Sequence, residues 1–232
     1  MTDRFIQDIR LITKESILSE VYLQARKCLI DYLAVTISGA CSFSGKALDY
    51  IQTMGHGNEN ATVIGLNCKT DMQTASLING MNAHVLELDD GHRQGALHVG
   101  STIFSALLAI AEKENLSSED FLYGAIIGYE VTVRLACAIQ PGNKLRGYHA
   151  TGTCGTVGAT MGIAAALGFD EEQMKSIAFA AAKAVGLDVF GGDCIVTPTG
   201  EIFIIDINDF PSFSAVRSEA AHEIARIIIE DK

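Results

Sequence analysis

The stretch NGMNAHVLELDDGHRQGALHVGSTIFSALLAIAE, residues 79–112, decides how the rest of this chain is interpreted. Residues 84–98 are dense in histidine, acidic and arginine side chains, and residues 101–111 then read as an apolar helix. Polar, titratable side chains at this density are costly to fold beside a buried helix unless they are solvated or used in chemistry. We therefore predict that this segment forms the wall of an active site.

Apolar residues recur at helical spacing through most of the remaining sequence up to residue 184. The helices that we expect span residues 3–10, 15–38, 48–54, 70–83, 101–112, 119–139, 151–167 and 171–184. Gly39 is expected to stop the second of these helices. We expect residues 61–67 to be extended and residues 142–149 to form a loop.

Size and composition narrow the function class. A chain of 232 residues with 48% apolar and 19% charged residues suits a globular protein with a sizeable core. Its formal charge of −11 argues against nucleic acid or an anionic membrane as a partner. The six cysteines are scattered, no export signal is evident, and no apolar run reaches about 18 residues, so we expect a cytoplasmic protein.

The sequence changes character near residue 185, where we place a domain boundary. Residues 185–232 hold nine acidic and three basic residues, which is more than half of the net charge. Two short β-branched segments at 194–196 and 202–205, separated by a Pro-Thr-Gly turn, predict a β-hairpin, and a last helix is expected at 214–230. The fold class is therefore mainly α: a helical domain over 1–184, then a short hairpin and helix over 185–232.

Two histidines are the predicted proton-transfer groups. Imidazole titrates near neutrality, and both His98 and His149 precede a helix that starts with small residues, whose free N–H groups attract carboxylates. We predict that both are catalytic, with capping or packing as the alternative. Asp90 is the preferred carboxylate, as an acid–base group or as a partner that orients a histidine, and Glu87 is included in the catalytic set.

Three further residues are predicted to bind substrate. Arg93 suits bidentate pairing with a carboxylate, and His92 and Thr151 complete this set. Asp89 could equally be functional or be a helix-end or solvated group. His84, which follows the small residue Gly80 by one helical turn, is expected to be buried and structural.

Several segments, in order, resemble the helical domain of the MmgE/PrpD family over about residues 3–184. The matching segments are ARKCLIDYLAVTISGA, ATVIGLN, ASLINGMNAHVLELDDGHRQGALHVGS, AIIGYEVTVRL and GYHATGTCGTVGAT. The resemblance implies cofactor-free dehydration, decarboxylation or epimerisation of a small di- or tricarboxylic acid by proton abstraction next to a carboxylate. Gly91 and Val99 replace a Thr and a Pro that are common in the family, and the D-D-G-H-R form favours the epimerase-like branch. Small-residue helix faces lead us to expect a homodimer.

The tail, GLDVFGGDCIV…TGEIFIIDINDFPSF, is similar to the C-terminal end of ATP-grasp ligases. This second resemblance implies that Asp193, Asp206 and Asn208 are magnesium ligands, with Mg²⁺ and ATP as cofactors if the tail is functional. Hard oxygen ligands of this kind suit Mg²⁺. An ATP-dependent ligase fragment, or a non-catalytic fusion product, is therefore the alternative to a lyase or isomerase.

Overall fold

The computed structural model describes residues 2–55, 57–174 and 176–177, together with four short strands of the C-terminal part. The described chain is mainly α, as the sequence predicts. The helices are α1 (Thr2–Arg10), α2 (Ser19–Met54), α3 (Met72–His84), α4 (Gly100–Glu114), α5 (Ser118–Ile139), α6 (Gly142–Leu145) and α7 (Ala150–Ala166), with a 3-10 turn at Lys14–Ser16. The strands are β1 (Ala61–Val63), β2 (Cys68–Thr70), β3 (Phe190–Gly191), β4 (Cys194–Val196), β5 (Ile202–Ile204) and β6 (Asn208–Asp209).

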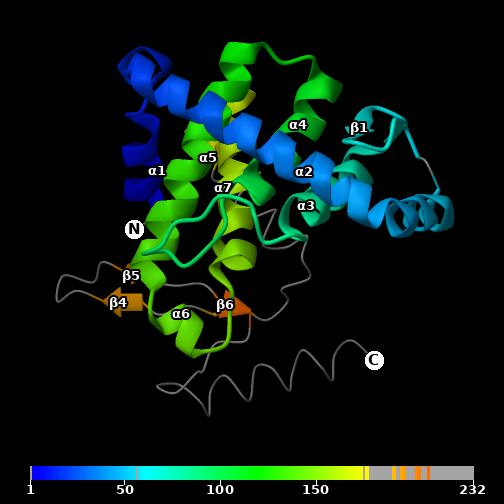
Figure 1. Ribbon diagram of the computed structural model, residues 1–232. Coiled ribbons are helices and arrows are strands. Elements are labelled where there is room, and N and C mark those ends of the chain that lie inside the picture. Colours follow the sequence, from blue (N-terminus) through cyan, green and yellow to red (C-terminus); the bar gives the residue numbers. More distant parts are fainter. Residues whose placement is uncertain are drawn as a thin grey trace, which may run out of the picture.

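The largest hydrophobic core lies where α4, α5 and α7 pack together and the long helix α2 crosses them (Figure 1). Phe104 of α4 is fully buried, and its ring centroid lies 5.4 Å from that of Tyr32 on α2. The ring centroids of Phe121 and Tyr129, both on α5, lie 6.2 Å and 5.7 Å from that of Phe104. Burying large aromatic rings removes much apolar area from water, so this cluster holds three helices in place.

Glycines let α5 and α7 pack at close range. A Cβ atom on Gly158 would lie only 1.7 Å from Oγ1 of Thr132, and one on Gly162 would lie 2.6 Å from the carbonyl oxygen of Gly124. Larger side chains at these positions would force the helices apart. This close contact holds α7 against α5, and His149, one of the predicted histidines, immediately precedes α7.

The prediction that a helix stops at Gly39 is wrong. Helix α2 continues without interruption from Ser19 to Met54 and joins two helices that we expected to be separate. A Cβ atom on Gly39 would lie 2.0 Å from the carbonyl oxygen of Asn82, so this glycine allows α3 to pack directly on α2. That packing offsets the roughly 1 kcal/mol that glycine costs in a helix interior.

The expected extended segment at 61–67 is confirmed only for its first three residues, which form β1. This strand pairs antiparallel with β2, a strand that the sequence analysis missed. The side chain of Asn79, which is 1% exposed, accepts a hydrogen bond from Ile64 N and donates one to Thr62 O, both at 2.9 Å. The hairpin is thereby tied to α3.

Most of the other expected boundaries agree with the structure to within two residues. The expected loop at 142–149 contains the short helix α6, and residues 171–174 are helical as expected. In the tail, β4 pairs antiparallel with β5, which is the predicted hairpin, and β3 pairs with β6. The predicted helix at 214–230 lies outside the described residues.

Two helices of the described chain, α2 and α5, are long and apolar enough to cross a membrane by length and composition alone. The sequence did not predict either span, because it contains no uninterrupted apolar run of about 18 residues. Length and composition alone are weak evidence for a membrane span, because the core helix of a soluble protein can meet both criteria. Helix α5 packs against both α4 and α7.

Candidate active site

The segment between α3 and α4 brings two histidines together. His84 is the last residue of α3, and His98 stands two positions before α4 begins. The two helices are in close contact, because a Cβ atom on Gly80 of α3 would lie 3.5 Å from Ser101 O of α4. As a result the ring centroids of His84 and His98 are 4.8 Å apart, with the rings edge to face.

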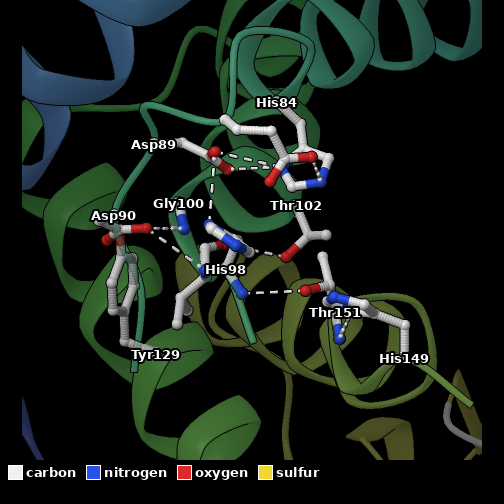
Figure 2. A network of polar contacts seen from close by, with 11 residues as sticks. His84, Asp89, Asp90, His98, Gly100, Thr102, Tyr129, His149 and Thr151 are labelled. Atoms are coloured by element: carbon white, nitrogen blue, oxygen red, sulfur yellow. Dashed lines mark hydrogen bonds and ion pairs between the residues drawn. The ribbon is translucent and has the colours of Figure 1, made fainter. Parts of the chain in front are cut away.

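Asp89 is the carboxylate that contacts both rings (Figure 2). Each of its oxygens lies 3.1 Å from Nδ1 of His84, and Oδ1 lies 3.4 Å from Nδ1 of His98. The contact with His98 is within ion-pair distance but is not aligned as a hydrogen bond. Nδ1 of His98 is buried and has no hydrogen-bond partner among the described residues.

Of the two alternatives for Asp89, a solvated helix-end group is wrong, since its side chain is 2% exposed. The chain turns after α3 through Glu87, whose φ of 53° is left-handed, and Asp89 faces back toward the end of that helix. His84 also differs from the prediction. Its side chain is 35% exposed, so it is a partly solvated member of this cluster and not a buried structural residue.

His149 lies on the other side of His98 (Figure 2). The ring centroids of these two histidines are 6.4 Å apart, and their planes are nearly parallel. His149 is exposed and caps α7, because its Nδ1 accepts a hydrogen bond of 3.2 Å from Thr151 N. Oγ1 of Thr151 accepts a second hydrogen bond, of 2.9 Å, from His98 N. The predicted His98, His149 and Thr151 therefore come together from the starts of α4 and α7.

Asp90, the preferred carboxylate of the sequence analysis, caps α4. Its Oδ1 accepts hydrogen bonds from Gly100 N at 2.8 Å and Val99 N at 3.3 Å, and its Oδ2 accepts one from the hydroxyl of Tyr129 at 2.7 Å. Burial, and then the negative charge of Asp90, raise the pKa of Tyr129, so this hydroxyl remains a donor. The start of α4, which we expected to attract a substrate carboxylate, is thus occupied by Asp90. The carboxylate in contact with the histidines is Asp89.

The remaining predicted residues occupy the rim of the site or the loop beside it. Glu87 is 73% exposed, and its Oε1 lies 3.5 Å from Nε2 of His84. Nδ1 of His92 accepts a hydrogen bond from Gly95 N and lies 3.8 Å from Sγ of Cys137. Arg93 is exposed. Substrate binding by His92 and Arg93 stays a prediction.

The comparison with protein families supports the first of the two resemblances. Residues 4–195 match the model of the MmgE/PrpD N-terminal domain. This chain belongs to the MmgE/PrpD family. The match includes all the residues that form the histidine cluster described above.

Curated relatives of this MmgE/PrpD chain have names that refer to cis-aconitate. It is 29% identical over 182 residues to the cis-aconitate decarboxylase-like protein oryM of Aspergillus oryzae. The matched region covers 73% of this chain and 37% of that protein. It is 28% identical over 186 residues to the cis-aconitate decarboxylase of Aspergillus terreus. The matched region covers 76% of this chain and 37% of that protein. The chain therefore spans little more than a third of the length of these relatives.

The MmgE/PrpD match continues beyond the boundary that we placed near residue 185. The similarity of the tail to ATP-grasp ligases gains no support from these comparisons. Of the predicted magnesium ligands, Asp193 and Asp206 lie outside the described residues, and only the backbone of Asn208, in β6, is described.

The sequence analysis missed two members of the site in this MmgE/PrpD chain, His84 and Asp89. A signal was present: a histidine at a helix C-terminus followed five residues later by a carboxylate, across a short turn. Asp89 and Asp90 are neighbours, so only the direction of the turn decides which of them faces the histidines. That direction depends on tertiary packing and not on local pattern.

Proposed function

We propose that this chain carries the proton-transfer histidines of a lyase that acts on a small polycarboxylic acid, with cis-aconitate decarboxylation as the reaction. The observation that carries the proposal is the position of His98 between the buried carboxylate of Asp89 and the exposed ring of His149. Family membership supports the class of reaction, and the names of the relatives support the substrate.

Decarboxylation of an unsaturated tricarboxylate is redox-neutral and needs one proton. The C–C bond to one carboxylate breaks, CO₂ leaves, and the electron pair of that bond stays in the remaining carbon skeleton. A proton must then reach a carbon of that skeleton, and a positioned imidazolium supplies it. The imidazole afterwards recovers its proton from solvent. His98 and His149 are two such groups, and each is partly or fully open to solvent.

We assign different tasks to the residues of the site. Asp89 contacts Nδ1 of His98 and orients the ring, which leaves Nε2 as the nitrogen available for the substrate. His149 accepts a hydrogen bond at Nδ1, so in its neutral form it carries its proton on Nε2. The hydroxyl of Thr151 accepts from His98 N and keeps its own hydrogen to donate to a substrate carboxylate.

The proposal is tested by incubating the chain with cis-aconitate and following CO₂ release and product formation by NMR. We expect turnover that falls about 100-fold or more in His98→Gln. Parallel incubations with 2-methylcitrate and iminodisuccinate test dehydration and epimerisation. Turnover of 2-methylcitrate alone or of iminodisuccinate alone would support proton transfer by the histidines but assign a different reaction. Turnover of none of the three substrates would contradict the proposal.

A further inference from the structure

We propose that His84, Asp89 and His98 form a binding site for one divalent transition-metal ion, with Zn²⁺ as the ion to be tested. One ligand atom from each of the three side chains can be chosen so that all lie within 4.8 Å of one another. The set comes from the end of α3 and from the segment that leads into α4. It is separate from the tail residues that the sequence analysis assigned to magnesium.

Two of the three separations between ligand atoms suit a small ion. In a tetrahedral zinc site with bonds of about 2.0–2.1 Å, neighbouring ligand atoms lie about 3.3 Å apart. Here Nδ1 of His84 lies 3.1 Å from the Asp89 carboxylate, and Nδ1 of His98 lies 3.4 Å from it. Both rings therefore present Nδ1 to one carboxylate at about this spacing. The widest separation in the set is within 4.8 Å, so the two rings would draw closer together on binding one ion.

An unsatisfied polar atom points to the same place. Nδ1 of His98 is buried, and among the described residues it has no hydrogen-bond partner, although the Asp89 carboxylate is only 3.4 Å away. Buried polar atoms in native proteins are nearly always paired, so an unpaired one requires an explanation. A metal ion bound by Asp89 and by His98 Nδ1 would satisfy this nitrogen without moving the ring far.

A second carboxylate stands where metal sites usually have one. A histidine that binds a metal through one ring nitrogen typically donates its other N–H to a carboxylate, which fixes the ring. Oε1 of Glu87 lies 3.5 Å from Nε2 of His84, the nitrogen that faces away from Asp89. Glu87 adopts a left-handed backbone conformation in the turn that brings it there.

The ligand chemistry selects the class of ion. Two imidazole nitrogens and one carboxylate oxygen suit Zn²⁺ and its transition-metal neighbours, whereas Mg²⁺ and Ca²⁺ prefer oxygen ligands. Three protein ligands leave a fourth position for water or for a carboxylate of a bound ligand. The side chains of His84 and His98 are 35% and 27% exposed, so an ion would reach the buried Asp89 carboxylate past the exposed parts of these rings.

Metal binding would compete with the proton transfer, a consequence that rests on the proposed function. An ion on Nδ1 of His98 replaces the proton there, so the ring can no longer act as an imidazolium donor. Zn²⁺ should therefore inhibit turnover, and a chelator should restore it. Binding itself is measured without substrate, so failure of the metal site and failure of the lyase proposal are distinguishable.

The test is isothermal titration of the chelator-treated full chain with Zn²⁺. We expect one ion per chain, and an affinity that falls by at least about 100-fold in His84→Gln and in Asp89→Asn, because each removes a ligand. The matched control is His92→Gln, the same substitution in the same loop outside the cluster, which should keep the wild-type affinity. No bound ion, or equal binding by both ligand variants and the wild type, would overturn the site.

X-ray absorption spectroscopy of the wild-type zinc complex keeps the proposal testable if the variants fail to fold. The expected first shell contains nitrogen and oxygen only, with two imidazoles. The chain has six cysteines, so adventitious binding would show sulfur at the longer Zn–S distance of about 2.3 Å. A sulfur-containing shell would refute the assignment.

Discussion

The carboxylate of Asp89 lies 3.4 Å from Nδ1 of His98 although its side chain is only 2% exposed. Burying a carboxylate costs free energy unless other groups pair with it. The groups that Asp89 faces are His84 and His98. This relationship supports the proposal that Asp89 orients the ring of His98. Asp90, one position later, serves the helix start instead.

Asp89→Asn should lower kcat/KM for cis-aconitate by about 10- to 100-fold. Expressed as a free energy, this loss should exceed the change in the free energy of unfolding. The amide keeps the shape of the side chain but removes the charge that orients His98, so the loss is smaller than the 10²–10⁴-fold typical of removing the acid–base group itself. Assays contain a chelator so that metal occupancy plays no part. Asp49→Asn, on an exposed face of α2, is the control and should have no effect. Equal activity of both variants would rule out this role.

Tyr129→Phe should lower the free energy of unfolding by about 1–3 kcal/mol, because it leaves the Asp90 carboxylate without one of its donors. Urea denaturation measures the change. Tyr50→Phe, at a position 39% exposed, removes a hydroxyl from the surface and should change stability by less than about 0.5 kcal/mol. If the two variants are equally stable, the hydrogen bond from Tyr129 does not contribute.

Alanine substitutions at two glycines of α2 should change the free energy of unfolding in opposite directions. Gly39→Ala places a methyl group 2.0 Å from Asn82 O and should destabilise the protein by about 1–3 kcal/mol. Gly45→Ala meets no atom within 4 Å, and alanine there should stabilise the helix by about 0.5–1 kcal/mol. Thermal and urea unfolding of both variants check the pair. No destabilisation by Gly39→Ala would show that α2 and α3 do not pack as described. Destabilisation by Gly45→Ala would show that Gly45 does not face open space.

The free energy of unfolding should decrease at low pH, in part because at least two carboxylates become protonated. The hydrogen bond from Thr74 N lowers the pKa of Asp71, and the hydrogen bond from Lys14 lowers the pKa of Asp120. Each group therefore contributes stability above its unfolded pKa, and this contribution is lost as pH falls through the folded pKa, between about pH 5 and pH 2. Free energies of unfolding measured against pH should show this slope.

Asp71→Asn separates the charge from the cap. Asparagine caps a helix about as well as aspartate, so stability at neutral pH should change little while the acid-dependent slope becomes shallower. An unchanged slope would show that Asp71 titrates alike in the folded and unfolded chain.

Much of the helical framework could be predicted from the sequence because apolar spacing and capping residues are local signals. Ser117, for example, accepts a hydrogen bond from Asp120 N at the start of α5, and serine is a common N-cap residue. Gly39 could not be predicted in the same way. Its local preference is to end a helix, and only the contact with Asn82 on another helix explains why α2 continues.

The site was predictable only in part. His98 and His149 were both predicted because each precedes a helix that starts with small residues, and the structure places their rings 6.4 Å apart. The roles of Asp89 and Asp90 could not be separated, because adjacent carboxylates in a turn have no periodic pattern. Their directions depend on how the turn at Glu87 packs against α3 and α4.

The most direct test of the account is a double-mutant cycle on His98→Gln and His149→Gln, with CO₂ release from cis-aconitate as the readout. Each single variant should lose about 10²–10⁴-fold in kcat, and the double variant should lose little more than the worse single one, because groups that act as a unit are not additive. Circular dichroism must show that all three variants are folded. Wild-type turnover in both single variants would contradict the account.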